Sequence, residues 1–321
     1  MIEKAHALGL RVLVDVVPNH FSDQHEWFQE ALKAGRGSKE RARFHFYDAN
    51  PDGTPPNNWI SLFGGPSWTQ VDDGQFYLHL FDSSQPDLNW DNPDVAEDFE
   101  KTLRFWLDLG ADGFRIDVAH GLVKEDVLKD HPDPQGLSDA LRLDMPMDPE
   151  RRYALLPTVP YFDRQGVHEI YRKWRTIFDS YGSREVMAVA EAWVHPNRRA
   201  AYASEEGLGQ AFGFDLLGQL WDHKGFRKTI DFQLKEAESF GSSTTWVFSN
   251  HDVIRHATRF GLDKESLANL PKWFRSADRE KKINFELGSA RAKAATMLVL
   301  ALPGSTYLYQ GEELGLHEPL N

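Results

Sequence analysis

The 321-residue sequence contains no cysteine, which excludes disulfide bonds and thiolate-ligated metal sites. It has no apolar run near the roughly 18 residues that a membrane helix requires, and its first residues lack the pattern of a secretory signal. Positive charge is in deficit, with 36 Lys and Arg against 49 Asp and Glu, giving a net charge of −13. We therefore expect a soluble, cytoplasmic protein whose main partner is neither nucleic acid nor an anionic membrane.

Short β-branched runs alternate with helical patterns along most of the chain. The runs are apolar almost throughout, which is typical of strands buried on both faces in a parallel α/β sheet. Six strands are predicted, at residues 11–17, 112–118, 185–193, 210–217, 244–252 and 305–313. Apolar residues at helical spacing predict helices at 94–110, 167–182 and 289–304.

Residues 21–84 interrupt this alternation. The segment is rich in Pro, Gly and Asn, and it is too long for an ordinary connection between a strand and a helix. It is therefore predicted to form a small inserted domain. Residues 122–166, with several prolines, form a second and shorter excursion.

Polar or charged residues end most of the predicted strands. In parallel α/β barrels the functional site lies at the C-terminal ends of the strands, so these residues predict a polar pocket. Capping of the following helices is the alternative explanation for the acidic ones. For Asp15, which lies within its strand, a structural role stays equally open. The strand-end residues are Asn19, His20, Asp117, Glu191, Asp215, His251 and Asp252.

Arg115 and Asp117 stand two residues apart in the predicted strand at 112–118, so their side chains point to the same side of the sheet. Burying charged groups in an apolar run is costly unless they pair or take part in chemistry. The pair is therefore a candidate for a functional site.

Five sequence blocks resemble the signature blocks of the α-amylase family, glycoside hydrolase family 13, and they follow the family's order. The block QPDLNW at 85–90 is similar to one found in the family's oligo-1,6-glucosidase and α-glucosidase branch. The resemblance covers essentially the whole chain. The other four blocks are DVVPNH at 15–20, GFRIDVAH at 113–120, EAW at 191–193 and FSNHD at 248–252.

The resemblance implies an α/β fold, a (β/α)8 barrel with a domain inserted after its third strand. Residues 1–20 and 85–321 would then form barrel strands three to eight, and residues 21–84 the inserted domain. Against the family pattern, we expect a chain truncated at both ends, lacking the first two strands and the C-terminal β-sandwich. Relatives that bind calcium do so through a loop after the first strand, so the resemblance implies no metal or other cofactor here.

By motif position, the resemblance assigns the chemistry of a retaining glycosidase to three carboxyl groups. Asp117 would be the nucleophile, Glu191 the general acid/base, and Asp252 the carboxylate that holds and distorts the sugar. The family's sugar contacts in the cleavage subsite would fall to His20, Arg115 and His251, with Gln85 bordering it.

Retention requires one ionised and one protonated carboxyl group roughly 5–5.5 Å apart. We expect Arg115 to lower the pKa of Asp117 and so keep it anionic. Ala192 and Trp193 follow Glu191 and give it an apolar setting, which would favour its protonated form.

The branch resemblance implies an exo-acting α-glucosidase that acts on short α-glucosidic oligosaccharides. In this branch the residue after the nucleophile tends to follow linkage, and Val118 favours α-1,6 over α-1,4 without deciding between them. A transglucosylase that uses the same intermediate is the enzymatic alternative. An inactive fragment or a non-catalytic binding homologue is the alternative from another class. Oligomeric state is not determined by the sequence.

Several further residues have two interpretations. Arg255 pairs either with a site carboxylate or with a neighbouring acid. His120 and His256 are expected to be hydrogen-bonding or surface residues of loops. Aromatic side chains of the insertion either stack on a sugar or form the insertion's own core, and nearby acids are expected in loops and turns. These aromatic residues are Trp59, Trp68 and Phe81, and the acids are Asp82 and Asp87.

Overall fold

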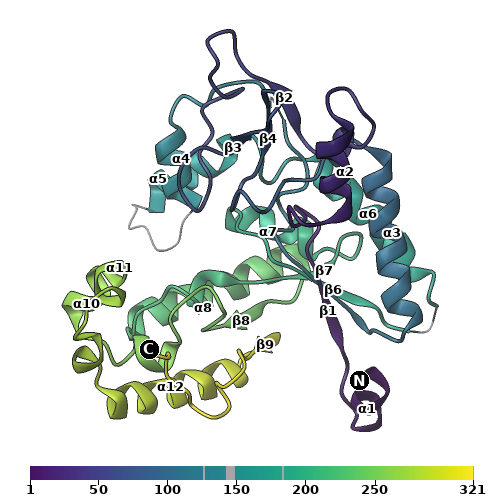
Figure 1. Cartoon of the computed structure of the whole chain (residues 1–321). Coiled ribbons are helices and arrows are strands. Elements are labelled where there is room, and N and C mark those ends of the chain that lie inside the picture. The colour runs from purple at the N-terminus through teal and green to yellow at the C-terminus, as the bar shows by residue number, and fades with distance from the viewer. Residues whose placement is uncertain (126, 142–148, 183, 321) are drawn as a thin grey trace. The chain divides into compact units, whose positions relative to one another are not determined.

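The computed structural model describes residues 1–125, 127–141, 149–182 and 184–320 (Figure 1). The chain divides into two compact units, Met1–Gly209 and Gln210–Asn321, and each is described by itself. The helices of the first unit are α1 (Ile2–Ala7), α2 (Glu26–Ala34), α3 (Pro93–Asp108), α4 (Pro134–Leu141), α5 (Pro149–Leu155), α6 (Gly166–Asp179) and α7 (Pro196–Ala203), with 3₁₀ turns at Arg41–Arg43 and Leu156–Thr158.

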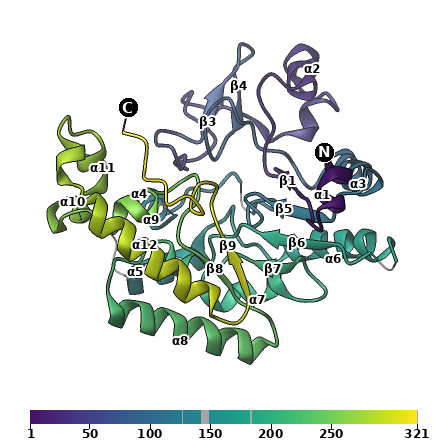
Figure 2. The same ribbon diagram turned by 90° about the horizontal axis from the view of Figure 1, so that it is seen from below.

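A sheet of four strands in the order β1-β5-β6-β7 lies at the centre of the first unit (Figure 2). β5 (Gly113–Ile116) pairs in parallel with β1 (Leu13–Val16) on one side and with β6 (Met187–Ala190) on the other. β7 (Gly209–Ala211) begins at the last residue of the unit. The predicted parallel α/β fold is confirmed, although each strand is shorter than its apolar run.

Helices α3 and α6 supply apolar faces of helical spacing, and both were predicted within a few residues. α3 begins after Asn92, whose side chain accepts the Asp94 backbone N–H, and it carries Pro93 in its first turn. Phe114 of β5 stacks on Phe178 of α6 with their ring centroids 5.7 Å apart. The buried residues of α3 are Val95, Phe99, Leu103 and Leu107.

The insertion contains an antiparallel sheet in the order β2-β4-β3, formed by β2 (Phe46–Asp48), β3 (Trp68–Gln70) and β4 (Gln75–Leu78). Its core is shared with the second excursion, residues 122–166. Trp59 and Trp68 are buried together with Tyr161 and Phe162 of that excursion. These two tryptophans therefore belong to a core, which answers the question left open for them.

The second unit contains a two-stranded parallel sheet of β8 (Thr245–Val247) and β9 (Ser305–Tyr307). Helices α8 (His223–Phe240) and α12 (Phe285–Leu300) pack with β8 around Trp246 (Figure 2). The remaining elements are α9 (His256–Arg259), α10 (Lys264–Ala268), α11 (Leu270–Phe274) and 3₁₀ turns at Phe214–Leu216 and Arg279–Lys282.

Three details of the second unit differ from the predictions. α12 begins and ends four residues before the predicted 289–304, because Asn284 caps its start by accepting the Leu287 backbone N–H. α8 was not predicted, although Asp222 caps it and Gly241, at φ 63°, ends it. Asp215 lies in a 3₁₀ turn and accepts a hydrogen bond from the Gln233 amide, so it does not end a strand as expected.

Among the helices that the structure describes, none is both long and apolar enough to cross a membrane.

Candidate active site

The register of the central sheet brings two of the predicted carboxylates to the same edge. Ile116 is the last residue of β5 and pairs with Ala190, the last residue of β6. Asp117 and Glu191 follow immediately, and the Glu191 backbone N–H donates to the Ile116 carbonyl at 2.9 Å. The two side chains therefore leave neighbouring parallel strands at their C-terminal ends, where barrel enzymes place their chemistry.

Arg115 joins three carboxylates at this edge. Its Nη1 lies 2.8 Å from Asp117 Oδ1 and 2.8 Å from Asp15 on the neighbouring strand β1. Its Nη2 lies 3.5 Å from Glu191 Oε2. Asp15, for which a structural role was equally open, is therefore the cross-strand partner of Arg115, as the pairing of these two residues in the sheet requires.

Glu191 is buried, with 8% of its side chain exposed, and a donor holds each of its oxygens. The Val118 backbone N–H donates to Oε2 at 2.9 Å, and the Trp193 indole N–H donates to Oε1 at 2.7 Å. Trp193 was expected only as an apolar neighbour. The sequence places it two residues after Glu191, but the rotamer that turns its N–H toward the carboxyl group is visible only in the structure.

Val118 has an unusual backbone, with φ at 44°. Positive φ is unfavourable for a β-branched residue and costs on the order of 1–3 kcal/mol. The strained peptide is the one whose N–H binds Glu191, so the strain lies at the carboxylate site itself.

Burial, and after it the charge of the neighbouring Glu191 carboxylate, raise the pKa of Asp117 to about 6. The Arg115 guanidinium acts in the opposite direction but does not overcome these two effects. Arg115 therefore lowers the pKa of Asp117 as expected, but the net pKa still lies above the ordinary value of an aspartate. Arg115 divides its charge among three acids, and Asp117 is left in a buried, negatively charged setting.

His20 and Gln85, both predicted at the cleavage subsite, lie next to each other. Gln85 Nε2 lies 3.1 Å from His20 Nε2, and Asn19 Nδ2 lies 3.2 Å from His20 Nδ1. Burial lowers the pKa of His20, which favours the neutral ring. Phe81 packs beside it with ring centroids 5.3 Å apart, so this aromatic residue adjoins a predicted sugar contact.

Asp87 was expected in a loop or turn, and it lies outside the named helices and strands, in an isolated bridge with His20. It is nevertheless fully buried. Lys124 Nζ lies 2.8 Å from Asp87 Oδ2, and both side chains have no exposed surface. Lys124 also donates to Asn19 Oδ1 at 2.8 Å, and Asn19 donates to Asp87 at 3.1 Å. This network supports the residue next to His20, and sequence analysis did not single out Lys124.

His120 is buried rather than exposed in a loop. Its ring packs against that of Phe162 in a tilted arrangement with centroids 4.3 Å apart, and burial lowers its pKa to about 4. The neutral imidazole therefore serves as part of the core beneath the site.

The second unit carries the remaining predicted site residues. His251 and Asp252 follow β8, with His251 Nε2 3.5 Å from Asp252 Oδ2 and more than half of each side chain exposed. Their roles beside Asp117 and Glu191 stay predictions, because they belong to a different unit.

Two neighbours of these residues have clear structural partners within the second unit. The Arg255 guanidinium donates to the Gln310 carbonyl at 2.7 Å, and its backbone N–H donates to Glu318 at 3.0 Å. Ser249 Oγ lies 2.8 Å from Nδ1 of the buried His256. Arg255 and His256 therefore help to build the second unit.

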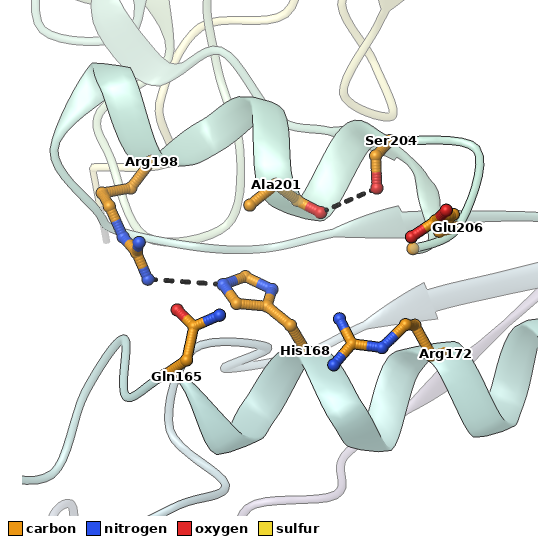
Figure 3. Close-up of a pocket in the computed structure, with 8 residues that line it drawn as sticks. Gln165, His168, Arg172, Arg198, Ala201, Ser204 and Glu206 are labelled. Atoms are coloured by element: carbon orange, nitrogen blue, oxygen red, sulfur yellow. Dashed lines mark hydrogen bonds between the residues drawn. The ribbon is translucent and has the colours of Figure 1, made fainter.

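A separate polar hollow of about 170 Å³ lies between α6 and α7 and includes none of the predicted site residues. Figure 3 shows the Arg198 guanidinium directed toward the His168 ring, at 3.4 Å. Arg198 is already paired with Asp163 at 2.8 Å, so its charge is compensated within the protein.

Within the described part of the chain, no group of three or more His, Asp or Glu side chains is arranged to hold a metal ion. The expectation that the chain needs no metal or other cofactor stays a prediction.

Parallel strands that deliver two carboxyl groups to one guanidinium at their C-terminal ends define an α/β enzyme site of the barrel type. Residues 1–320 match the family described as the catalytic domain of alpha amylase, and the chain belongs to that family, glycoside hydrolase family 13.

Relatives and solved structures agree with this membership. The chain is 34% identical to a probable alpha-glucosidase of Rhizobium meliloti, over 99% of this chain and 54% of the relative. It is 32% identical to an oligo-1,6-glucosidase of Parageobacillus thermoglucosidasius, over 98% of this chain and 52% of the relative.

Among solved structures, the alpha-glucosyl transfer enzyme XgtA superposes with a TM-score of 0.76 at 32% identity, covering 99% of this chain and 54% of that one. Isomaltulose synthase from Erwinia rhapontici NX5 gives a TM-score of 0.76 at 29% identity, covering 98% and 52%. The chain thus spans about half the length of the proteins that it matches.

Proposed function

We propose that the chain carries the catalytic carboxylates of a retaining, exo-acting α-glucosidase that releases glucose from short α-linked oligosaccharides. The observation that carries the proposal is the meeting of Asp117 and Glu191 at the ends of neighbouring strands, within reach of one arginine. Membership of the α-amylase family and the alpha-glucosidase and oligo-1,6-glucosidase names of its relatives support it.

In the proposed reaction, an oxygen of the Asp117 carboxylate attacks the anomeric carbon and the bond to the leaving oxygen breaks. Glu191 gives its proton to that oxygen, which leaves a covalent glucosyl-aspartate. A water molecule then attacks the same carbon, Glu191 takes up a proton from it, and Asp117 departs as a carboxylate. Two inversions give net retention of the α configuration.

The surroundings of the two carboxyl groups support this division of roles. Asp117 has its guanidinium partner at 2.8 Å, which stabilises the anion needed for attack at neutral pH. Glu191 is buried between fixed donors, which holds it in one orientation for proton transfer. We assign sugar binding to His20, Gln85, Arg115 and His251. The carboxylate of Asp252 is assigned the role of holding the sugar.

Linkage preference is proposed to include α-1,6 bonds. Val118 follows the nucleophile, and it is the residue type that the oligo-1,6-glucosidase branch favours there. The oligo-1,6-glucosidases among the relatives are consistent with this preference, and α-1,4 activity beside it is compatible with the alpha-glucosidases.

A transglucosylase is the second candidate, and two structural neighbours favour it. XgtA is an alpha-glucosyl transfer enzyme, and isomaltulose synthase is named for the disaccharide it makes. Both outcomes share the glucosyl-enzyme intermediate and differ in whether water or a sugar hydroxyl intercepts it.

The test is glucose release from isomaltose and maltose by the 321-residue chain, with Asp117→Asn as the matched inactive variant. Turnover that Asp117→Asn abolishes supports the proposal, and added sugar acceptors that divert glucose into longer products identify the transglucosylase. Absence of turnover on both disaccharides would contradict an active glucosidase and would instead favour the non-catalytic or inactive-fragment alternative.

A further inference from the structure

We propose that Trp193 is a positioning residue that fixes the general acid Glu191 through its indole N–H. The inference rests on the proposed function for its catalytic meaning, but the contact itself is a property of the fold. Nε1 of Trp193 lies 2.7 Å from Glu191 Oε1, a short distance for a neutral donor and a carboxylate acceptor.

The two oxygens of Glu191 are held from different elements. Oε2 is held by the Val118 backbone N–H, which follows β5, while Oε1 is held by Trp193, which follows β6 with Glu191 itself. One donor alone leaves a carboxyl group free to rotate about its last bond. Two donors on opposite oxygens fix the plane of the group, and with it the direction in which its proton is given.

Burial makes this arrangement effective. Glu191 is 8% exposed, so water competes weakly for its oxygens and a hydrogen bond there is stronger than at the surface. An indole N–H can only donate, so the contact persists as an N–H···O bond whichever oxygen of Glu191 carries the proton. Trp193 therefore orients the acid in both halves of the reaction without exchanging a proton itself.

The contact has a readout that does not depend on turnover. In the full chain labelled with ¹⁵N-tryptophan, the indole resonance of Trp193, identified by its absence in Trp193→Phe, should move as Glu191 ionises. The movement should disappear in Glu191→Gln. The indole of Trp273 is the internal control, because it donates to the Arg279 backbone carbonyl at 3.0 Å and should not follow Glu191.

The catalytic consequence is tested with two kinds of substrate. Trp193→Phe keeps an aromatic ring but removes the donor, so we expect kcat/KM for isomaltose, whose leaving group needs protonation, to fall about tenfold. Hydrolysis of α-glucosyl fluoride, which needs little acid assistance, should fall less than about twofold. Removing a donor to the carboxylate should also move the alkaline limb of the isomaltose profile to higher pH.

The outcomes separate the inference from the proposed function. A Trp193 resonance that ignores pH, or that still titrates in Glu191→Gln, would overturn the inference whether or not the chain is active. Equal losses on both substrates would overturn it as well, because damage to the fold lowers both alike. A resonance that follows Glu191 in a chain without turnover would support the contact and count against the glucosidase.

Discussion

Asp117, the proposed nucleophile, lies in a setting that resists its ionisation. Burial and the charge of Glu191 both favour the protonated acid, and Arg115 only partly offsets them. Since the pKa of Asp117 is raised to about 6, the carboxylate predominates at neutral pH and not in mild acid. The sign is the reverse of that for a simple salt-bridged aspartate. Stability from this carboxyl group is present below its ordinary pKa and is lost as the pH rises through about 6.

The acidic limb of the pH–rate profile should therefore lie near pH 6. The nucleophile must be ionised to attack, so kcat/KM should fall as the pH drops through the raised pKa of Asp117. With α-glucosyl fluoride as substrate, Glu191→Gln should move this limb to lower pH, because it removes the neighbouring negative charge. An acidic limb near pH 4 in the unaltered chain would contradict the raised pKa of Asp117.

At the scale of elements, the site depends on how closely β5 and β6 approach. Gly113 opens β5 opposite Met187, the first residue of β6. A Cβ atom added to Gly113 would lie 1.9 Å from the Met187 backbone carbonyl oxygen. Because the obstructing atom belongs to the backbone of a paired strand, it has no rotamer by which to move away.

Gly113→Ala should accordingly destabilise the fold by about 2 kcal/mol or more, a cost of the order measured for overpacked cores. Gly218→Ala is the matched control, because a Cβ atom there meets nothing within 4 Å and the backbone has no positive φ. Thermal unfolding of the two variants should show a large drop in Tm for the first and little change for the second. Similar Tm values for the two variants would contradict the close approach of β5 and β6 at Gly113.

Lys124 and Asp87 connect the insertion boundary to the turn after β5. Lys124→Met should cost about 3–5 kcal/mol, because it leaves the Asp87 carboxylate buried without its cation. The double variant Lys124→Met with Asp87→Leu should recover part of this loss, since it removes the uncompensated charge. Denaturant unfolding gives the free energy of unfolding of both variants. A double variant that is clearly less stable than Lys124→Met alone would contradict the ion pair.

The sequence predicted the elements better than the contacts between their side chains. The strands ending near Asp117 and Glu191 follow from apolar runs, and the sheet edge where they meet follows from parallel pairing. The pair formed by Lys124 and Asp87 joins residues far apart in the chain and carries no local signal.

The net rise in the pKa of Asp117 was not predicted, for a related reason. The sequence shows Arg115 two residues away, but it does not show that Asp15 and Glu191 share the same guanidinium. The missed helix α8 is different, because its cap at Asp222 and its stop at Gly241 were visible. The many charged residues on the exposed face of α8 made its amphipathic pattern hard to recognise in the sequence.

At the scale of the whole molecule, the predicted chemistry is distributed over two units. Asp117 and Glu191 belong to the first and Asp252 to the second, and the chain spans about half the length of its relatives. We propose that Asp117 acts as the nucleophile of a working glycosidase in this chain. This role requires a covalent bond between a sugar and Asp117, which no structural role of the carboxylate would produce.

Trapping that bond is the most direct test. A 5-fluoro-α-glucosyl fluoride forms the glucosyl-enzyme quickly and releases it slowly, so the adduct accumulates for peptide mass spectrometry. We predict one fluoroglucosyl group per chain, attached to Asp117 and absent from Asp117→Asn. An adduct on another residue, or an unlabelled chain after prolonged exposure to the reagent, would contradict the account.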